Sequence, residues 1–198
     1  MSNNSTSPLY GLILSGGKST RMGEDKGLLD YHGIPQREYL YGLLENLGLP
    51  CYLSIRLDQK NNIPNNFKVI VDNDRYRGPF NGMLTAHATY PRAAWLVLAC
   101  DLPLLNKVAL KNLVLKRNTN KTATAYATNA SSLPEPLVAI WEPTGLQKAK
   151  EYLKTAESSC PRKYLINSDT ELVFPERDEV LYNANSLSEY QFAKSKLR

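Results

Sequence analysis

The stretch YGLILSGGKSTRMGEDK, residues 10–26, decides the fold of this chain. Its first six residues form a short apolar run that glycines stop, which predicts a buried β-strand. The following loop carries the cations Lys18, Arg21 and Lys26. Three like charges in one loop repel each other unless an anion lies among them. The stretch therefore predicts a strand that ends in a triphosphate-binding loop, with a solvated basic turn as the alternative.

Two familiar nucleotide loops do not fit this stretch. Gly17, Lys18 and Ser19 supply the end of a P-loop, G-x-x-x-x-G-K-[ST], but its first glycine would fall on Leu12 inside the strand. The glycines are also wrongly spaced for the dinucleotide fingerprint G-x-G-x-x-G. Paired glycines still expose backbone N–H groups to a ligand, so another kind of nucleotide loop is expected.

Outward from this loop, apolar runs alternate with helical patterns along the whole chain. Strands are expected at residues 10–15, 51–55, 67–72, 94–100, 122–128, 136–141, 171–174 and 180–183. Helices are expected at residues 35–47, 81–90, 108–116, 143–153 and 160–167, and after Ser186. This alternation predicts an α/β fold with a mostly parallel sheet. We expect a disordered lead at residues 1–8 and a single domain at residues 9–198.

Polar residues follow two further predicted strands. In parallel sheets, ligands bind beyond the carboxyl ends of the strands. Asp101 comes directly after the strand at 94–100 and suits Mg²⁺, which prefers carboxylate and phosphate oxygens. Asp72 and Asp74 follow the strand at 67–72, and Gly78 and Gly82 shape the loop that opens the next helix. The alternative interpretation is that these residues only form turns.

Composition limits the classes of partner. The chain has 198 residues, a net charge of +5 and 42% apolar residues, as expected for a globular protein that attracts anions. It has no long Lys/Arg block and no apolar run of the roughly 18 residues that a membrane helix needs. MSNNSTSP at the N-terminus lacks the pattern of a signal peptide. We expect a cytoplasmic protein with a small anionic substrate, and neither nucleic acid nor a membrane as partner.

With these residues in view, the chain resembles the molybdenum cofactor guanylyltransferases. Residues 14–26 are similar to the family signature L-x-G-G-x-S-x-R-M-G-x-D-K. VDNDRYRGPFNGMLTA at 71–86, LVLACDLPLL at 96–105 and EPLVAIW at 135–141 resemble further family segments, as do Asn183 and Asn185. The resemblance covers nearly the whole chain. It implies a Rossmann-like α/β/α sandwich of the nucleotidyltransferase type and the transfer of GMP from GTP to the phosphate of molybdopterin.

The resemblance also implies roles for single residues. Arg21, Lys26 and Asp101 would carry the catalysis, Asp101 would bind Mg²⁺, and Asn183 and Asn185 would face the pterin. The implied nucleotide-binding positions are Leu14, Ser15, Gly16, Gly17, Lys26, Asp72, Gly78, Gly82 and Asp101.

This chain departs from the family pattern at three places that bear on recognition. Arg56 ends a Ser-Ile-Arg sequence where the family has an asparagine-rich strand end, Asn81 replaces a small residue, and Ser186-Leu187 replace Thr-Pro. The role of Arg56 stays open.

Several alternatives stay open beside this resemblance. The enzyme could transfer CMP to the same pterin, although glycine rather than alanine at position 16 favours guanine. It could also serve another phosphate acceptor, as sugar-phosphate nucleotidyltransferases do. A non-enzymatic carrier that delivers the finished nucleotide cofactor is the third alternative. A molybdoenzyme or its chaperone is a candidate protein partner in either case.

Overall fold

The computed structural model describes residues 6–17 and 25–197, and seven strands of this part form one sheet. The strands are β1 Leu9–Leu14, β2 Cys51–Ile55, β3 Val69–Val71, β4 Ala94–Ala99, β5 Ala123–Ala127, β6 Pro134–Trp141 and β7 Thr170–Val173. The helices are α1 Gln36–Glu45, α2 Phe80–Thr89, α3 Lys107–Leu115, α4 Pro143–Tyr152, α5 Pro161–Ile166 and α6 Leu187–Lys196, with 3₁₀ turns η1 Lys26–Leu28, η2 Leu57–Asn62 and η3 Asp178–Leu181.

The sheet has the order β3-β2-β1-β4-β6-β5-β7. β1 pairs in parallel with β2 and β4, β2 with β3, and β5 with β7. β6 is antiparallel to both of its neighbours, with Leu98 opposite Val138 in the β4–β6 register. The prediction of a mostly parallel α/β sheet is confirmed. One consequence of the reversed β6 is that its first residues, not its last, lie at the carboxyl end of β4.

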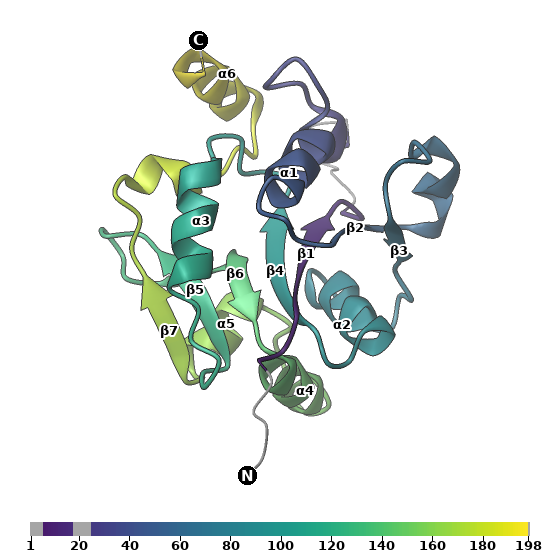
Figure 1. The fold of residues 1–198 in the computed structure, drawn as a ribbon, viewed down its shortest axis with the longest axis vertical. Coiled ribbons are helices and arrows are strands. Elements are labelled where there is room, and N and C mark those ends of the chain that lie inside the picture. Colours follow the sequence, from purple (N-terminus) through teal and green to yellow (C-terminus); the bar gives the residue numbers. More distant parts are fainter. Residues whose placement is uncertain (1–5, 18–24, 198) are drawn as a thin grey trace.

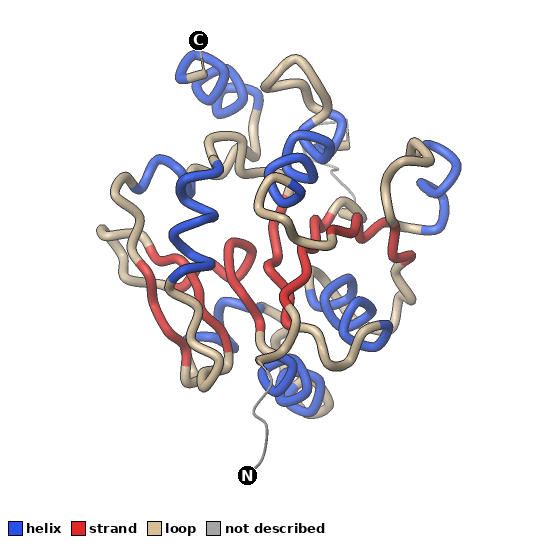
Figure 2. Tube along the Cα trace, in the orientation of Figure 1, coloured by secondary structure: helices blue, strands red, loops and turns tan. Residues whose placement is uncertain are grey.

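Two apolar layers cover the two faces of the sheet. In β1, Ile13 packs with residues of α1 and α3, whereas the adjacent Leu12 packs with residues of α2, α4 and α5. This separation follows because successive side chains of a strand point to opposite faces. The result is an α/β/α sandwich, with helices on both sides of the central strands (Figure 2).

The ends of the helices agree with the local sequence signals. Helix α1 begins directly after Pro35 and ends at Glu45, and Gly48, which has φ +74°, lies in the turn that follows. Ser186 caps α6 by accepting a hydrogen bond from the Glu189 N–H, as the S-x-x-E sequence predicts. Helix α6 lies at one end of the molecule, near the C-terminus, and α4 lies at the opposite end (Figure 1).

One prediction about local structure is wrong. Residues 180–183 were expected to form a strand, but η3 ends at Leu181, whose side chain is buried in the core beside α3. A short apolar run has no period that distinguishes a strand from a buried turn. Residues 1–5 of the expected lead lie outside the described residues, and at its end the carbonyls of Ser7 and Pro8 accept hydrogen bonds from Arg117 and Ala94.

No helix of the described residues is long and apolar enough to cross a membrane.

Candidate active site

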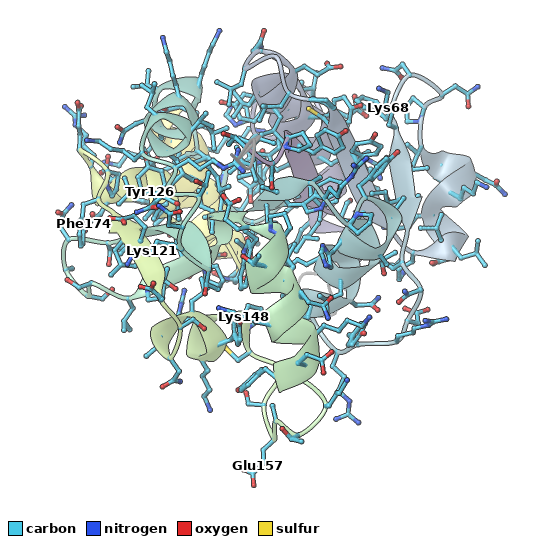
Figure 3. The ribbon with its side chains drawn as sticks, turned by 60° about the horizontal axis from the view of Figure 1, so that its bottom comes forward. Lys68, Lys121, Tyr126, Lys148, Glu157 and Phe174 are labelled. Carbon is cyan, nitrogen blue, oxygen red and sulfur yellow. The ribbon has the colours of Figure 1, made fainter. Side chains whose placement is uncertain are left out.

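A cavity of about 650 Å³ lies at the carboxyl ends of β1, β2, β3 and β4. This volume is within the range of small-molecule sites. Its lining includes each of the predicted nucleotide-binding positions, and Asn185 from the predicted pterin side. The predicted catalytic residue Arg21 lies outside the described residues. Figure 3 brings forward the opposite end of the molecule, where α4 carries Lys148 and the loop beyond it carries Glu157.

The glycine loop begins where β1 ends. The Ser15 N–H donates to the Ser54 carbonyl at 2.9 Å, which continues the pairing of β1 with β2. Gly16 then passes so close to Asp72 that an added Cβ would lie 2.7 Å from Asp72 Oδ2. Gly17 has open space around it. Gly16 therefore allows the loop to pass beside a carboxylate, whereas Gly17 leaves room at the cavity wall.

Asp72 lies in the cavity wall below this loop. Its Oδ1 accepts a hydrogen bond of 2.7 Å from Ser54 Oγ. Burial raises the pKa of Asp72, and the nearby Asp74 also raises it, against the lowering effects of Ser54 and Arg56. A partly buried carboxylate beside a cavity can accept hydrogen bonds from ligand N–H groups, and such bonds would relieve its desolvation.

The loop before α2 closes the same side of the cavity. Gly78 has φ +63°, a conformation that favours glycine. A Cβ at Gly82 would lie 2.2 Å from Ser54 Oγ and 2.9 Å from Leu14 Cδ2, so this glycine lets α2 approach the strand ends. Asn81 accepts from the Tyr76 N–H and donates to Asp74. The asparagine that departs from the family pattern thus holds the loop.

Lys26 and Asp101, which both line the cavity, form an ion pair. Lys26 Nζ lies 3.6 Å from Asp101 Oδ2, and each side chain is 20% exposed. Asp25 caps η1 by accepting from the Gly27 N–H at 2.9 Å, which fixes the backbone that carries Lys26. Lys26 also donates to Asn185 Oδ1. The sheet thus brings together a cation from the glycine loop and a carboxylate that follows β4.

The segment that contains Asn183 and Asn185 is tied to the end of β4. The Ala184 N–H donates to the Asp101 carbonyl at 2.8 Å, and Glu189 Oε2 accepts from the Asn185 N–H at 2.7 Å. The Asn183 amide nitrogen fits 2.7 Å from Asp101 Oδ2, since a carboxylate oxygen there requires a donor. The two asparagines therefore lie beside Asp101, on the side of the cavity that Leu137 of β6 also lines.

Burial disfavours the charged form of Asp101. Burial raises the pKa of its carboxyl, and the nearby Lys26 only partly counteracts this. A divalent cation or another positive group would offset the remaining penalty. The neighbouring Cys100 has a buried thiol with its pKa raised to about 12. It stays protonated at neutral pH, so it is not an activated nucleophile.

A Mg²⁺ ion fits this part of the cavity. The described residues contain no cluster of three or more His, Cys, Asp and Glu side chains that could hold a metal by themselves. Asp101 supplies the hard carboxylate oxygen that Mg²⁺ prefers, and Asn183 and Asn185 lie beside it. Such a sparse set suits an ion that keeps several waters and takes the rest of its ligands from substrate phosphates.

No role was predicted from the sequence for the side chains of Arg56 and Gln59, which hold the backbone of the glycine loop. Arg56 Nη1 donates to the carbonyls of Gly16 and Gly17 at 3.0 and 3.2 Å. The buried Gln59 contacts both Ser15 and Asp25. The spacing Arg56-x-x-Gln59 at the start of η2 was the available signal, because a glutamine three residues after a helix cap often binds back to the cap.

A doubly covered sheet with a glycine loop, a lysine and a strand-end aspartate around one cavity defines a nucleotidyltransferase. Residues 11–169 match the family described as "MobA-like NTP transferase domain". The chain belongs to this family.

Individual relatives agree with this assignment. The chain is 36% identical over 187 residues to the "Molybdenum cofactor biosynthesis bifunctional protein" of Synechocystis, covering 94% of this chain and 54% of that protein. The chain thus spans about half the length of this relative. It is 26% identical over 188 residues to the "Molybdenum cofactor guanylyltransferase" of Shewanella halifaxensis, covering 94% of each.

A solved structure shares the fold. The molybdopterin-guanine dinucleotide biosynthesis protein A of Archaeoglobus fulgidus superposes with a TM-score of 0.75 at 16% identity, covering 94% of this chain and 97% of that chain. The prediction of a Rossmann-like nucleotidyltransferase sandwich is confirmed. So is the resemblance to the molybdenum cofactor guanylyltransferases, since relatives carry that name.

Proposed function

We propose that this protein transfers GMP from GTP to the terminal phosphate of molybdopterin, or of the metal-loaded cofactor, and releases pyrophosphate. The observation that carries the proposal is the pairing of Lys26 with Asp101 at 3.6 Å in the lining of the cavity. A cation beside a carboxylate that could hold a metal suits a triphosphate whose α-phosphate lies next to the pair. The relatives named as guanylyltransferases support the same reaction.

The proposal puts the two substrates on opposite sides of the cavity, and the order of the strands supports it. The guanine base lies over β2 and β3, where Asp72 can accept from its N–H groups. The triphosphate lies along Gly16 and Gly17, with Lys26 and Asp101 near the α-phosphate. The acceptor lies over β4 and β6, near the Asn183–Asn185 segment. In this arrangement, the acceptor phosphate approaches the α-phosphorus from the side opposite the leaving pyrophosphate.

The chemistry needs little from the protein except position and charge. An oxygen of the acceptor phosphate bonds to the α-phosphorus of GTP, and the bond from that phosphorus to the oxygen shared with the β-phosphate breaks. The acceptor is already deprotonated near neutral pH, so no general base is required. Lys26 offsets the repulsion between the two anions. Asp101 would hold Mg²⁺, which would supply charge neutralisation of the phosphates when bound.

The test is pyrophosphate release with molybdopterin as acceptor and Mg²⁺ present, run with GTP, CTP, ATP and UTP in parallel. The proposal expects turnover with GTP and at least tenfold less with the other three. Preferred use of CTP would make the protein a cytidylyltransferase for the same pterin. Tight binding of the guanine dinucleotide cofactor without any pyrophosphate release would make it a carrier that delivers the cofactor to a molybdoenzyme or its chaperone.

A further inference from the structure

We propose that Gln59, assisted by Arg56, is a positioning residue that clamps the two ends of the nucleotide loop. This inference rests on the proposed function, because it assigns the loop to a nucleotide. Gln59 lies in η2, directly after β2, and only 6% of its surface is exposed. It does not belong to the signature stretch, and its contacts lie 34 and 44 residues away in the sequence.

The side-chain amide of Gln59 makes three hydrogen bonds. Its Nε2 donates to the Ser15 carbonyl at 3.0 Å and to Asp25 Oδ2 at 2.7 Å. Its Oε1 accepts from the Arg56 N–H at 2.8 Å. The reversed amide would put an oxygen against two acceptors and a nitrogen against a donor. The three partners thus determine one orientation of the amide.

Two of these partners stand at opposite ends of the glycine loop. Ser15 is the first residue after β1, and Asp25 is the cap of η1, immediately before Lys26. One buried amide therefore sets the distance between Ser15, where the loop starts, and Asp25, the residue before the predicted catalytic Lys26. Asp25 is engaged on both oxygens, since its Oδ1 accepts from the Gly27 N–H.

Arg56 orients the peptide groups between these ends. Asp58 binds the guanidinium through two contacts of 3.0 and 3.1 Å, which leaves Nη1 to donate to the Gly16 and Gly17 carbonyls. In a trans peptide the C=O and the next N–H point in opposite directions. Holding the Ser15 and Gly16 carbonyls on Gln59 and Arg56 turns the next two N–H groups away from these side chains. The clamp thus preorganises loop donors before the phosphates arrive.

The matched test replaces Gln59 by Glu, which keeps the shape but puts an oxygen in the place of both donated hydrogen bonds. Gln191→Glu, on the exposed surface of α6, makes the same change of charge away from the clamp. Loss of two buried hydrogen bonds predicts a Kd for Mg·GTP that is raised about tenfold or more. The KM for molybdopterin stays within about twofold, because the acceptor side does not contact the clamp. A wild-type Kd in Gln59→Glu overturns the inference.

Hydrogen exchange of the Gly27 amide supplies a readout that needs no nucleotide. In nucleotide-free Gln59→Glu we expect this amide to exchange about tenfold faster than in the wild type and in Gln191→Glu. Unchanged exchange overturns the clamp. If the wild-type protein turns over no GTP, the proposed function fails, whereas this measurement still decides whether Gln59 holds the loop. Gln59→Met, which removes all three hydrogen bonds without adding charge, replaces Gln59→Glu if the latter does not fold.

A double variant tests the contact itself. Asp25→Asn combined with Gln59→Glu exchanges the carboxylate and the amide, so a donor again faces an acceptor between the two positions. Gln59→Glu alone is expected to speed up exchange of the Gly27 amide, and we expect the double variant to reverse at least half of that increase. If the effects of Asp25→Asn and Gln59→Glu on Gly27 exchange are simply additive in the double variant, the proposed contact is overturned.

Discussion

Replacement of Asp101 by Asn separates what this carboxylate does for catalysis from what it does for stability. Asn keeps the shape of the side chain and removes its charge. In the nucleotide-free protein the charge is a liability, because burial raises the pKa of Asp101 more than Lys26 lowers it. The attraction between unit charges 3.6 Å apart is on the order of 4 kcal/mol at an effective dielectric constant near 20, and burial of the carboxylate opposes it.

The consequence for stability has a definite sign. A carboxyl whose pKa is raised in the folded state contributes most below its ordinary pKa, and this contribution is lost as the pH rises through the raised value. At pH 7 the wild type therefore carries a penalty that Asp101→Asn removes. We expect the Tm of Asp101→Asn at pH 7 to equal or exceed that of the wild type, and its free energy of unfolding to fall less between pH 4 and pH 7.

The consequence for catalysis is opposite. Loss of one preorganised electrostatic group from a phosphoryl-type site lowers kcat by roughly 10²–10³, equivalent to about 3–4 kcal/mol of transition-state stabilisation. The assay is pyrophosphate release with GTP, Mg²⁺ and molybdopterin, at saturating substrates and with Tm measured on the same samples. Wild-type turnover in Asp101→Asn would refute the assigned role. A loss of activity that only parallels a lower Tm would refute the argument from burial.

Three further perturbations test the rest of the cavity. Gly16→Ala places a Cβ 2.7 Å from Asp72 Oδ2 and must displace that carboxylate, so we expect titration calorimetry to show a Kd for GTP raised about tenfold. The control Gly42→Ala, in open space on α1, leaves the Kd unchanged. Equal affinities of the two variants would contradict the close approach of Gly16 to Asp72. Lys26→Met should raise the Kd for GTP about tenfold or more relative to Lys148→Met at the opposite end of the molecule, and an unchanged Kd would remove Lys26 from the phosphate site. Chelation of divalent metal should abolish turnover and added Mg²⁺ should restore it, so turnover that persists in excess chelator would exclude the proposed metal role.

Much of the fold follows from local patterns in the sequence. The apolar run that ends in Leu14 stops at paired glycines, Asn106 caps α3, and Ser186 with Glu189 caps α6. Each of these signals involves residues close together along the chain. Short apolar runs were less informative, as residues 180–183 show. The direction of β6 was also beyond local reasoning, because a strand and its reverse have the same alternation of apolar and polar residues.

The sequence by itself determined which residues could meet a triphosphate: a glycine loop with cations at the end of one strand, and aspartates directly after two others. The tertiary structure alone decided how they are held. Lys26 lies against Asp101 and the Asn183–Asn185 segment because β1 and β4 are neighbours in the sheet. Gln59 joins the ends of the loop across 44 residues of sequence. Contacts between residues so far apart depend on strand order and burial, which no spacing in the sequence records.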